Sequence, residues 1–306
     1  AVALYRLAVF SPIHQQPRKT DKNRMLAAVT KLLFLFGFSN SLLTMSSALA
    51  ASDSKVKPKD ESSEVLNSWK SRWNDNAIGW HIPDVHESLL KHGHQIIPQF
   101  TSKEETCSNP VRVFVPLCGK TVDMAFLARH KSVSEVVGID GIKKALEEFS
   151  SENPDLGLAE KESSDAYERL VGKNILLLKG DFFELNEASV GGLFDSVWDR
   201  ASIVAIDPSL REDYVRVTKG LVKPGGTLLV STFERRTGTE QGIKGGPPFS
   251  VPESEVRRLY ESQDWVESVE LLEEINQYEK SPASKKFESQ GVTSLFELVF
   301  VIKVKA

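Results

Sequence analysis

Cysteine is scarce in this sequence, and its scarcity excludes two kinds of protein. Cys107 and Cys118 are the two cysteines in 306 residues, too few for the disulfide framework of a small secreted domain. Neither belongs to a CxxC pair, so a zinc site built on such pairs is not expected. We interpret both as reduced thiols in a reducing compartment.

A strong excess of either charge is also missing. The chain has 38 lysines and arginines against 42 aspartates and glutamates, a net charge of −4. General nucleic-acid binders usually carry a large basic excess, so we predict no nucleic-acid partner. His81, His86, His92 and His94 lack a spacing that would join them with acids or cysteines on one face, so no metal is predicted. We expect His92 and His94 at the surface.

Apolar runs long enough to cross a bilayer are missing too. The apolar core LLFLFGF, at residues 32–38, is far shorter than the roughly 20 residues that a spanning helix needs. No stable membrane span is therefore predicted. This run lies in an N-terminal extension whose first 31 residues contain six lysines and arginines and one acid.

Three interpretations of the extension remain open. From Met25 it resembles a secretory signal, with ALA at 48–50 as a cleavage site. From residue 1, its basic and acid-poor composition fits a mitochondrial or plastid presequence. Because the chain begins with alanine, the third interpretation is an incomplete or untranslated extension, with the true start at Met45.

A polar segment at 52–64 separates this extension from the rest and is predicted to be a linker. The sequence therefore predicts two parts, an extension with its linker at 1–63 and a globular domain at 64–306. We expect a cytoplasmic protein, or an organellar or secretory one if residues 1–50 are a targeting segment.

Within the globular part, short apolar runs alternate with amphipathic helical patterns, as in a mostly parallel sheet covered by helices on both faces. Strands are predicted at 111–115, 135–140, 174–181, 194–200, 227–233, 266–275 and 294–305. Helices are predicted at 64–75, 82–97, 121–130, 142–153, 208–222 and 251–264, and a surface excursion at 148–173. The predicted fold class is α/β, with a Rossmann-like sheet of seven strands whose last two form an antiparallel edge.

The turn after the first predicted strand, in VFVPLCGKTVDM at 113–124, has one glycine where nucleotide-binding loops have several. A P-loop needs a glycine five positions before Gly119, and that position is Phe114, inside the strand. The dinucleotide fingerprint needs three glycines. A triphosphate and a dinucleotide are therefore both disfavoured as ligands.

A nucleoside without phosphates, as in S-adenosylmethionine, remains compatible with this turn. One glycine permits a close backbone approach, and Asp140 follows 21 residues later, where a carboxylate can accept hydrogen bonds from ribose hydroxyls. Asp181 and Phe182 follow the third strand, where an acid and an aromatic ring suit adenine. The structural alternatives are a helix cap for Asp140 and a turn former for Asp181.

Five segments together resemble the thiopurine S-methyltransferase family. They are SWKSRWNDNAIGWH, RVFVPLCGKTVDMAFLA, VVGID, FDSVWDRASIVAIDP and GGPPFSVPESEVRRLY. The resemblance covers residues 65–306, and the PLCGK turn, the WDR motif and the GPPF segment make it specific in combination. It implies a monomeric, S-adenosylmethionine-dependent methyltransferase that acts on a small aromatic or heterocyclic thiol such as a thiopurine.

The resemblance also implies a cofactor site. Its members come from the N-terminal helix, the first loop and the strand ends: Trp69, Trp73, Trp80, Leu117, Gly119, Asp140, Asp181, Phe182 and Arg200. In the family, the N-terminal helix closes over the cofactor, so the three indoles would shield the sulfonium and attract its charge. Asp140 stands where the family usually has the longer glutamate, and Arg200 stands at the rim between cofactor and substrate.

Catalysis is expected to need alignment more than a strong base, because aromatic thiols ionise readily and the sulfonium is a good leaving group. Arg200 is predicted to stabilise the thiolate or to hold a substrate carboxylate. Asp199 is predicted to orient Arg200 or to take a proton through water, with a plain salt bridge between the two as the structural alternative. Cys118 is not expected to act as a nucleophile, because the transfer is direct.

Other functions remain in competition. A relative that methylates halide or thiocyanate ions would have a smaller site without the substrate arginine, so Arg200 favours thiols, with selenium compounds as a further possibility. A cofactor-binding pseudoenzyme is disfavoured by Asp140, Asp181 and the WDR motif. One departure concerns substrate recognition: vertebrate members have an Arg/His-containing stretch near the C-terminus, whereas residues 276–292 here offer lysines, namely Lys280, Lys285 and Lys286.

Overall fold

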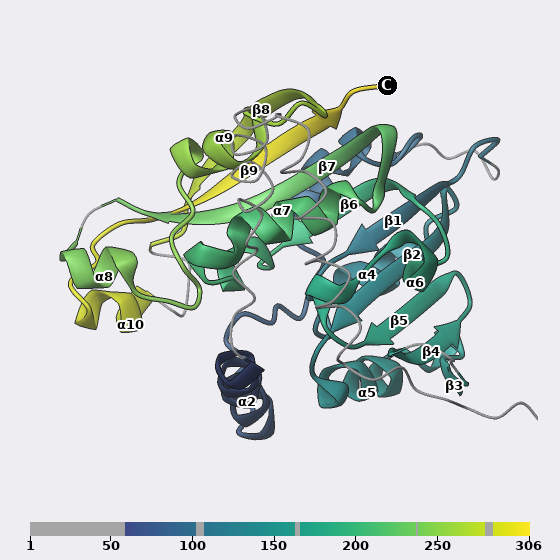
Figure 1. The fold of residues 1–306 in the computed structure, drawn as a ribbon, viewed down its shortest axis with the longest axis horizontal. Helices are drawn as coiled ribbons and strands as arrows, with labels where there is room; N and C mark the ends of the chain where they lie inside the picture. The colour runs from purple at the N-terminus through teal and green to yellow at the C-terminus, as the bar shows by residue number, and fades with distance from the viewer. Residues whose placement is uncertain (1–58, 102–106, 163–165, 237, 279–283) are drawn as a thin grey trace, which may run out of the picture. The chain divides into compact units, whose positions relative to one another are not determined.

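The computed structural model describes five stretches of the chain, drawn in colour in Figure 1. They are residues 59–101, 107–162, 166–236, 238–278 and 284–306, without the side chains of 59–63 and 284–286. The extension predicted before residue 59 and the side chains of the three C-terminal lysines lie outside this description. The described stretches all belong to one unit, Lys59–Ala306.

A nine-stranded sheet has the order β3-β4-β5-β2-β1-β6-β7-β9-β8, and Figure 1 shows β8, β9 and β7 on one side with β5, β4 and β3 on the other. The five central strands are parallel: β5 (Ile175–Lys179), β2 (Val133–Asp140), β1 (Val111–Val115), β6 (Phe194–Arg200) and β7 (Val222–Arg235). β9 (Leu295–Val304) pairs antiparallel with β7, and β8 (Val266–Asn276) pairs antiparallel with β9. The predicted Rossmann-like class and its antiparallel edge are confirmed.

Two strands of this sheet were not predicted. β3 (Ala159–Lys161) and β4 (Glu168–Gly172) extend the opposite edge antiparallel, inside the segment interpreted as a surface excursion. β3 is exposed throughout and β4 has no fully buried residue, so neither shows the apolar alternation that identifies a strand in sequence. Their order comes instead from backbone pairing with the neighbouring strand.

The helices of the described residues are α2 (Lys59–Asn74), α3 (Glu87–His92), α4 (Val122–Ala128), α5 (Lys143–Glu152), α6 (Glu187–Val190), α7 (Arg211–Lys219), α8 (Glu240–Lys244), α9 (Glu253–Tyr260) and α10 (Ser284–Ser289). None of them is long and apolar enough to cross a bilayer. α2 begins before the predicted residue 64, so the end of the supposed linker is helical. The helix predicted at 82–97 is shorter, because His86 has an extended backbone and caps α3 by accepting the N–H of Ser88 on its ring.

Two apolar layers cover the two faces of the sheet. Phe114 and Val197 point into the layer that α7 and α9 complete. Their chain neighbours Val113 and Trp198 point into the layer that α4 and α5 complete. Successive side chains of a strand alternate between faces, so consecutive residues of β1 and β6 serve different layers.

The strand order reverses at β1, which lies between β2 and β6 and pairs parallel with both. In open parallel sheets, ligands bind beyond the carboxyl ends of the strands at such a reversal. β1, β2 and β6 end at Val115, Asp140 and Arg200. The fold therefore brings the PLCGK turn, Asp140 and the WDR motif to one edge of the sheet.

Candidate functional site

The turns that follow β1 and β6 have strained backbones. Leu117 has φ +40° and Ala201 has φ +63°, both left-handed, a conformation that costs residues other than glycine roughly 1–2 kcal/mol. Gly119, with φ +53°, adopts it at little cost. The Ser202 hydroxyl donates to the Pro116 carbonyl over 2.6 Å and joins the two turns. Strain at neighbouring strand ends favours a functional site at this point.

Asp140 connects the first turn to the start of α5. Its carboxylate accepts the N–H of Gly119 and the N–H of Ile142, each over 2.8 Å. Burial raises the pKa of Asp140 to about 6, and the backbone donors oppose that shift. A carboxylate offers about four acceptor positions, and the Gly141 backbone also acts on this one, so acceptor capacity remains for another donor. Asp140 thus holds the first turn and the start of α5 together, and its carboxylate can still accept a hydrogen bond from a ribose hydroxyl.

Three indole side chains gather beside this turn, as the resemblance implied. Trp80 meets Trp69 and Trp73 edge-on, with ring centroids 5.2 and 6.2 Å apart. A Cβ atom on Gly119 would lie 3.3 Å from the Trp73 ring, so the missing side chain makes room for the indole. The Lys144 ammonium donates to the Trp73 carbonyl over 2.9 Å, which fixes the end of α2 against α5.

The two other polar residues of the PLCGK turn have structural partners. Lys120 lies 2.9 Å from a Glu148 oxygen and 2.7 Å from a Glu152 oxygen, and these glutamates raise its pKa against the effect of burial. Its ammonium therefore binds the turn to α5. Burial raises the pKa of the Cys118 thiol well above its ordinary value, which agrees with an inert thiol in a tight turn.

The end of β5 differs in detail from the predicted adenine site. Asp181 is exposed and accepts the N–H of Phe183 over 2.9 Å, as a turn former does. The Phe182 ring is 2% exposed and stacks on Tyr214 at 4.6 Å, within the apolar layer. Phe183 is only partly buried and meets Phe182 edge-on at 5.4 Å. Phe183, which sequence reasoning passed over, is thus the more accessible aromatic ring of the pair.

Asp199 and Arg200 lie on opposite faces of β6, because consecutive strand residues alternate. The Asp199 carboxylate accepts the Tyr214 hydroxyl over 2.7 Å and the Ile203 N–H over 3.3 Å. Burial raises the pKa of Asp199 to about 6. Its carboxylate is thus turned away from Arg200, and the geometry supports neither the orienting role nor the salt bridge considered for this pair.

Arg200 projects from the end of β6 toward the indoles. Its Nη1 donates to the Trp80 carbonyl over 2.9 Å. Its Nε is buried and has no hydrogen-bond partner among the residues that the structure describes. Burial lowers the pKa of Arg200, although the carboxylates of Asp123 and Glu297 act to raise it. A buried N–H without a partner favours a ligand at this position.

Two acids that sequence reasoning missed lie on the Arg200 side of the sheet. Asp123 and Glu297 are each 1% exposed. Each stands inside an otherwise apolar run, Asp123 in VDMAFLA and Glu297 in LFELVFV. An acid that interrupts an apolar run is the sequence feature that could have indicated a buried carboxylate. His92 was also misplaced: it is buried, and its Nε2 lies 2.8 Å from a Glu273 oxygen.

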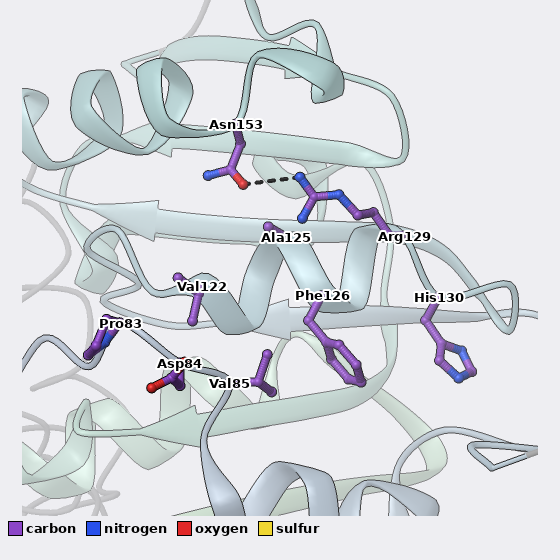
Figure 2. Close-up of a pocket in the computed structure, with 9 residues that line it drawn as sticks. All are labelled: Pro83, Asp84, Val85, Val122, Ala125, Phe126, Arg129, His130 and Asn153. Atoms are coloured by element: carbon purple, nitrogen blue, oxygen red, sulfur yellow. Dashed lines mark hydrogen bonds between the residues drawn. The ribbon is translucent and has the colours of Figure 1, made fainter.

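Two cavities in the described part of the structure do not include the central residues of this site in their linings. Figure 2 shows the first, a cavity of about 450 Å³ whose lining includes Val85 before α3, Phe126 and Arg129 from α4, and Asn153 after α5. The second, about 520 Å³, lies between α5 and the β3–β4 edge. Neither lining includes Asp140 or Arg200, so the site is located by backbone strain, unpaired polar atoms and strand order.

These residues fit an adenosyl cofactor. The PLCGK turn presents its backbone where the strand order reverses, Asp140 has spare acceptor capacity, and Arg200 has an unpaired N–H. A group of aromatic side chains stands beside them, suited to a cation and an apolar methyl group. In the described part of the chain, no cluster of acids, histidines and cysteines could hold a metal ion.

Comparison with known proteins identifies the family. A model of the family described as thiopurine S-methyltransferase matches residues 65–305. The thiopurine S-methyltransferases of Pseudomonas paraeruginosa and Aliivibrio salmonicida are 32% and 33% identical to this chain, each over 77% of this chain and 97% of their own. A 1,6-didemethyltoxoflavin-N1-methyltransferase structure from Burkholderia thailandensis, with bound S-adenosylhomocysteine, aligns over 83% of this chain and 93% of its own, with a TM-score of 0.48 and 15% identity. The chain belongs to the thiopurine S-methyltransferase family and is an S-adenosylmethionine-dependent S-methyltransferase.

Proposed function

We propose that this chain methylates the sulfur of a small aromatic or heterocyclic thiol of the thiopurine type. The observation that carries the proposal is Arg200, whose buried Nε lacks a partner in the described part of the structure, at the sheet edge that also carries Asp140 and the indoles. A guanidinium suits a delocalised thiolate or a heteroaromatic nitrogen. The thiopurine S-methyltransferases that resemble this chain support the same substrate class.

The chain's residues would hold the cofactor by backbone and carboxylate contacts. Leu117 and Gly119 offer their backbone, Asp140 accepts the ribose hydroxyls, and Trp69 with its neighbouring indoles faces the positive charge. The segment at Asp181, with Phe182 or the more accessible Phe183, would border adenine. S-adenosylmethionine supplies a methyl group activated by a sulfonium leaving group.

The acceptor step needs a thiolate and a straight approach. The thiol proton would pass to water and Arg200 would stabilise the sulfur anion, whose electron pair would take the methyl group that the sulfonium of a bound cofactor would release. No general base is required, which agrees with Asp199 being engaged with Tyr214 on the other face. The indoles exclude water from the reacting atoms.

The proposal also covers the oligomeric state of the protein, its partners and its compartment. We propose a monomer that acts on small molecules, without a nucleic-acid partner, in agreement with the net charge of −4. The unpaired thiols Cys107 and Cys118 support a reducing, cytoplasmic setting.

A methyl-transfer assay tests the substrate class. Purified protein with labelled S-adenosylmethionine should methylate thiophenol and 6-mercaptopurine with kcat/KM at least about tenfold above that for iodide, thiocyanate or selenite, because Arg200 suits a delocalised organic anion. Efficient turnover of iodide or thiocyanate with none of the thiols would reverse the assignment. If the protein methylates none of these acceptors, both the thiol and the halide or thiocyanate methyltransferase assignments are wrong.

A further inference from the structure

A row of polar residues crosses three strands beside the acceptor site. Arg200 on β6 is paired in register with Ser231 on β7, so their side chains lie on the same face. The Ser231 hydroxyl donates to Glu297 Oε1 on β9 over 2.7 Å. Arg200, Ser231 and Glu297 thus form a continuous line at the edge where the site lies.

Glu297 is a buried carboxylate whose hydrogen bonds come from uncharged donors. It accepts from the hydroxyls of Ser88 and Ser231, over 2.8 and 2.7 Å, and from the Gln277 amide over 2.8 Å. His86 Nε2 lies 3.6 Å away, but burial lowers the pKa of His86, so its ring is neutral at pH 7. None of these three donors carries a positive charge that would offset the carboxylate.

Asp123 adds a second negative charge to the same layer. It accepts the indole N–H of Trp198 over 2.8 Å and the backbone N–H of His86 over 2.9 Å, again from uncharged donors. Both carboxylates attract Arg200. Burial also lowers the pKa of His81, the other histidine that faces Arg200, so it adds no charge at neutral pH. One arginine therefore faces two buried acids.

We propose that Glu297 sets the charge preference of the acceptor site: together with Asp123 it offsets the charge of Arg200, so the site accepts uncharged thiols and disfavours obligate anions. A thiol enters with its proton and loses it to water beside Arg200. Iodide, thiocyanate and carboxylate-bearing thiols must enter with a full negative charge, against the field of two acids. The inference rests on the proposed thiol methyltransferase function and adds to it a cause of selectivity.

The test replaces Glu297 with glutamine, which keeps the size of the side chain and removes its charge. The amide oxygen can still accept the two serine hydroxyls, and the Gln277 amide can turn to pair with the new amide. Glu270→Gln is the matched control, because Glu270 is an exposed acid on β8 and its loss changes the net charge equally. Asp123→Asn, which keeps the size of the other buried acid and removes its charge, is a second variant with the same sign.

The measured quantity is the ratio of kcat/KM for 2-mercaptobenzoate, which carries a carboxylate, to that for thiophenol, with thiocyanate as a second anion. We expect Glu297→Gln to raise the ratio about tenfold, the size of a unit charge acting over roughly 10 Å at an effective dielectric constant near 20. Glu270→Gln should change it less than about twofold, because an exposed charge is screened. Asp123→Asn should raise it as well, because it removes the other buried charge that faces Arg200.

A purely structural role for Glu297 would slow all acceptors alike, so an unchanged ratio overturns the inference. If Glu297→Gln does not fold, the Asp123→Asn ratio decides, and a ratio equal to wild type overturns the inference as well. If the wild-type protein methylates thiols and both variants have the wild-type ratio of kcat/KM for 2-mercaptobenzoate to that for thiophenol, only this inference is contradicted. Wild-type protein without thiol turnover would contradict the proposed function itself.

Discussion

Replacing Asp140 with alanine should weaken S-adenosylmethionine binding by at least about 100-fold, since two charge-assisted hydrogen bonds are worth roughly 1.5–3 kcal/mol each. The substitution removes the acceptor for the ribose. It also releases the N–H groups of Gly119 and Ile142, which Asp140 now holds at 2.8 Å, so the turn loses its shape. Isothermal titration calorimetry at pH 7.5 measures the effect directly.

Two controls make the Asp140 result specific. Asp140→Asn keeps the shape but replaces one acceptor by a donor, and it should fall between wild type and alanine. Asp155→Ala removes an exposed acid that pairs with Arg129 on the far side of α5, and it should leave the affinity unchanged. Wild-type affinity in Asp140→Ala would show that the cofactor does not bind at the end of β2.

The pH dependence of binding follows from the same carboxyl group. Burial raises the pKa of Asp140 from its ordinary 3.8 to about 6. The ribose hydroxyls donate to the ionised form, so a proton must leave before the cofactor binds at lower pH. Affinity should be constant above pH 7 and fall about tenfold per pH unit below pH 6, and Asp140→Asn should lack this slope.

The stability of the unliganded protein responds to this group with the opposite sign. A carboxyl whose pKa is raised in the folded chain holds its proton more tightly there than in the unfolded chain. Its contribution to the free energy of unfolding is fully present below pH 3.8 and is lost as the pH rises through about 6. Asp199 behaves in the same way, because burial also raises its pKa to about 6.

Arg200→Met should lower kcat/KM for thiophenol by about 100-fold, the usual range for removing one group that stabilises a developing anion. Cofactor affinity should change much less, because Asp140 and the first turn remain intact. Arg200→Lys keeps the charge and loses the planar fork, so part of the activity should return. Steady-state kinetics with thiophenol, beside calorimetry with the cofactor, separates the two effects.

Loss of Arg200 also leaves Asp123 and Glu297 without their counter-charge. Among the described residues no direct ion pair joins Arg200 to either acid, so the loss of unfolding free energy should stay below the roughly 3–5 kcal/mol of a broken buried salt bridge. The double variant Arg200→Met with Glu297→Gln should recover part of that stability in urea unfolding and still fail to restore turnover. A single Arg200→Met variant with more than half of wild-type turnover would show that Arg200 has no role in the acceptor step.

Sequence reasoning located the strand ends well, because they coincide with abrupt changes of residue type. FDSVWDR at 194–200 matches β6 at both ends, and Asp140 closes β2 as predicted. Gly119 was explained by a close backbone approach to the cofactor, whereas the neighbour that the structure places against it is the Trp73 ring. These features are local, so their signals lie within a few residues of one another.

The features that sequence reasoning missed depend on contacts between distant segments or on side-chain direction. The Ser88 hydroxyl meets Glu297 across 209 positions of the chain, and no local pattern predicts that pair. Asp199 and Phe182 stand beside the site in sequence, but their side chains point into the apolar layer, where Tyr214 meets both. An acid inside an apolar run proved the better guide to a buried polar network.

The central claim is that the turn after β1, the end of β2 and the end of β6 together form the S-adenosylmethionine site. A crystal structure of the protein with S-adenosylhomocysteine tests it most directly. In that complex the ribose hydroxyls should lie on the Asp140 carboxylate, the first turn should lie against the nucleoside, and the cofactor sulfur should lie between the indoles and Arg200. Density for the ligand in the cavity of Figure 2, or with Asp140 uncontacted, would contradict it.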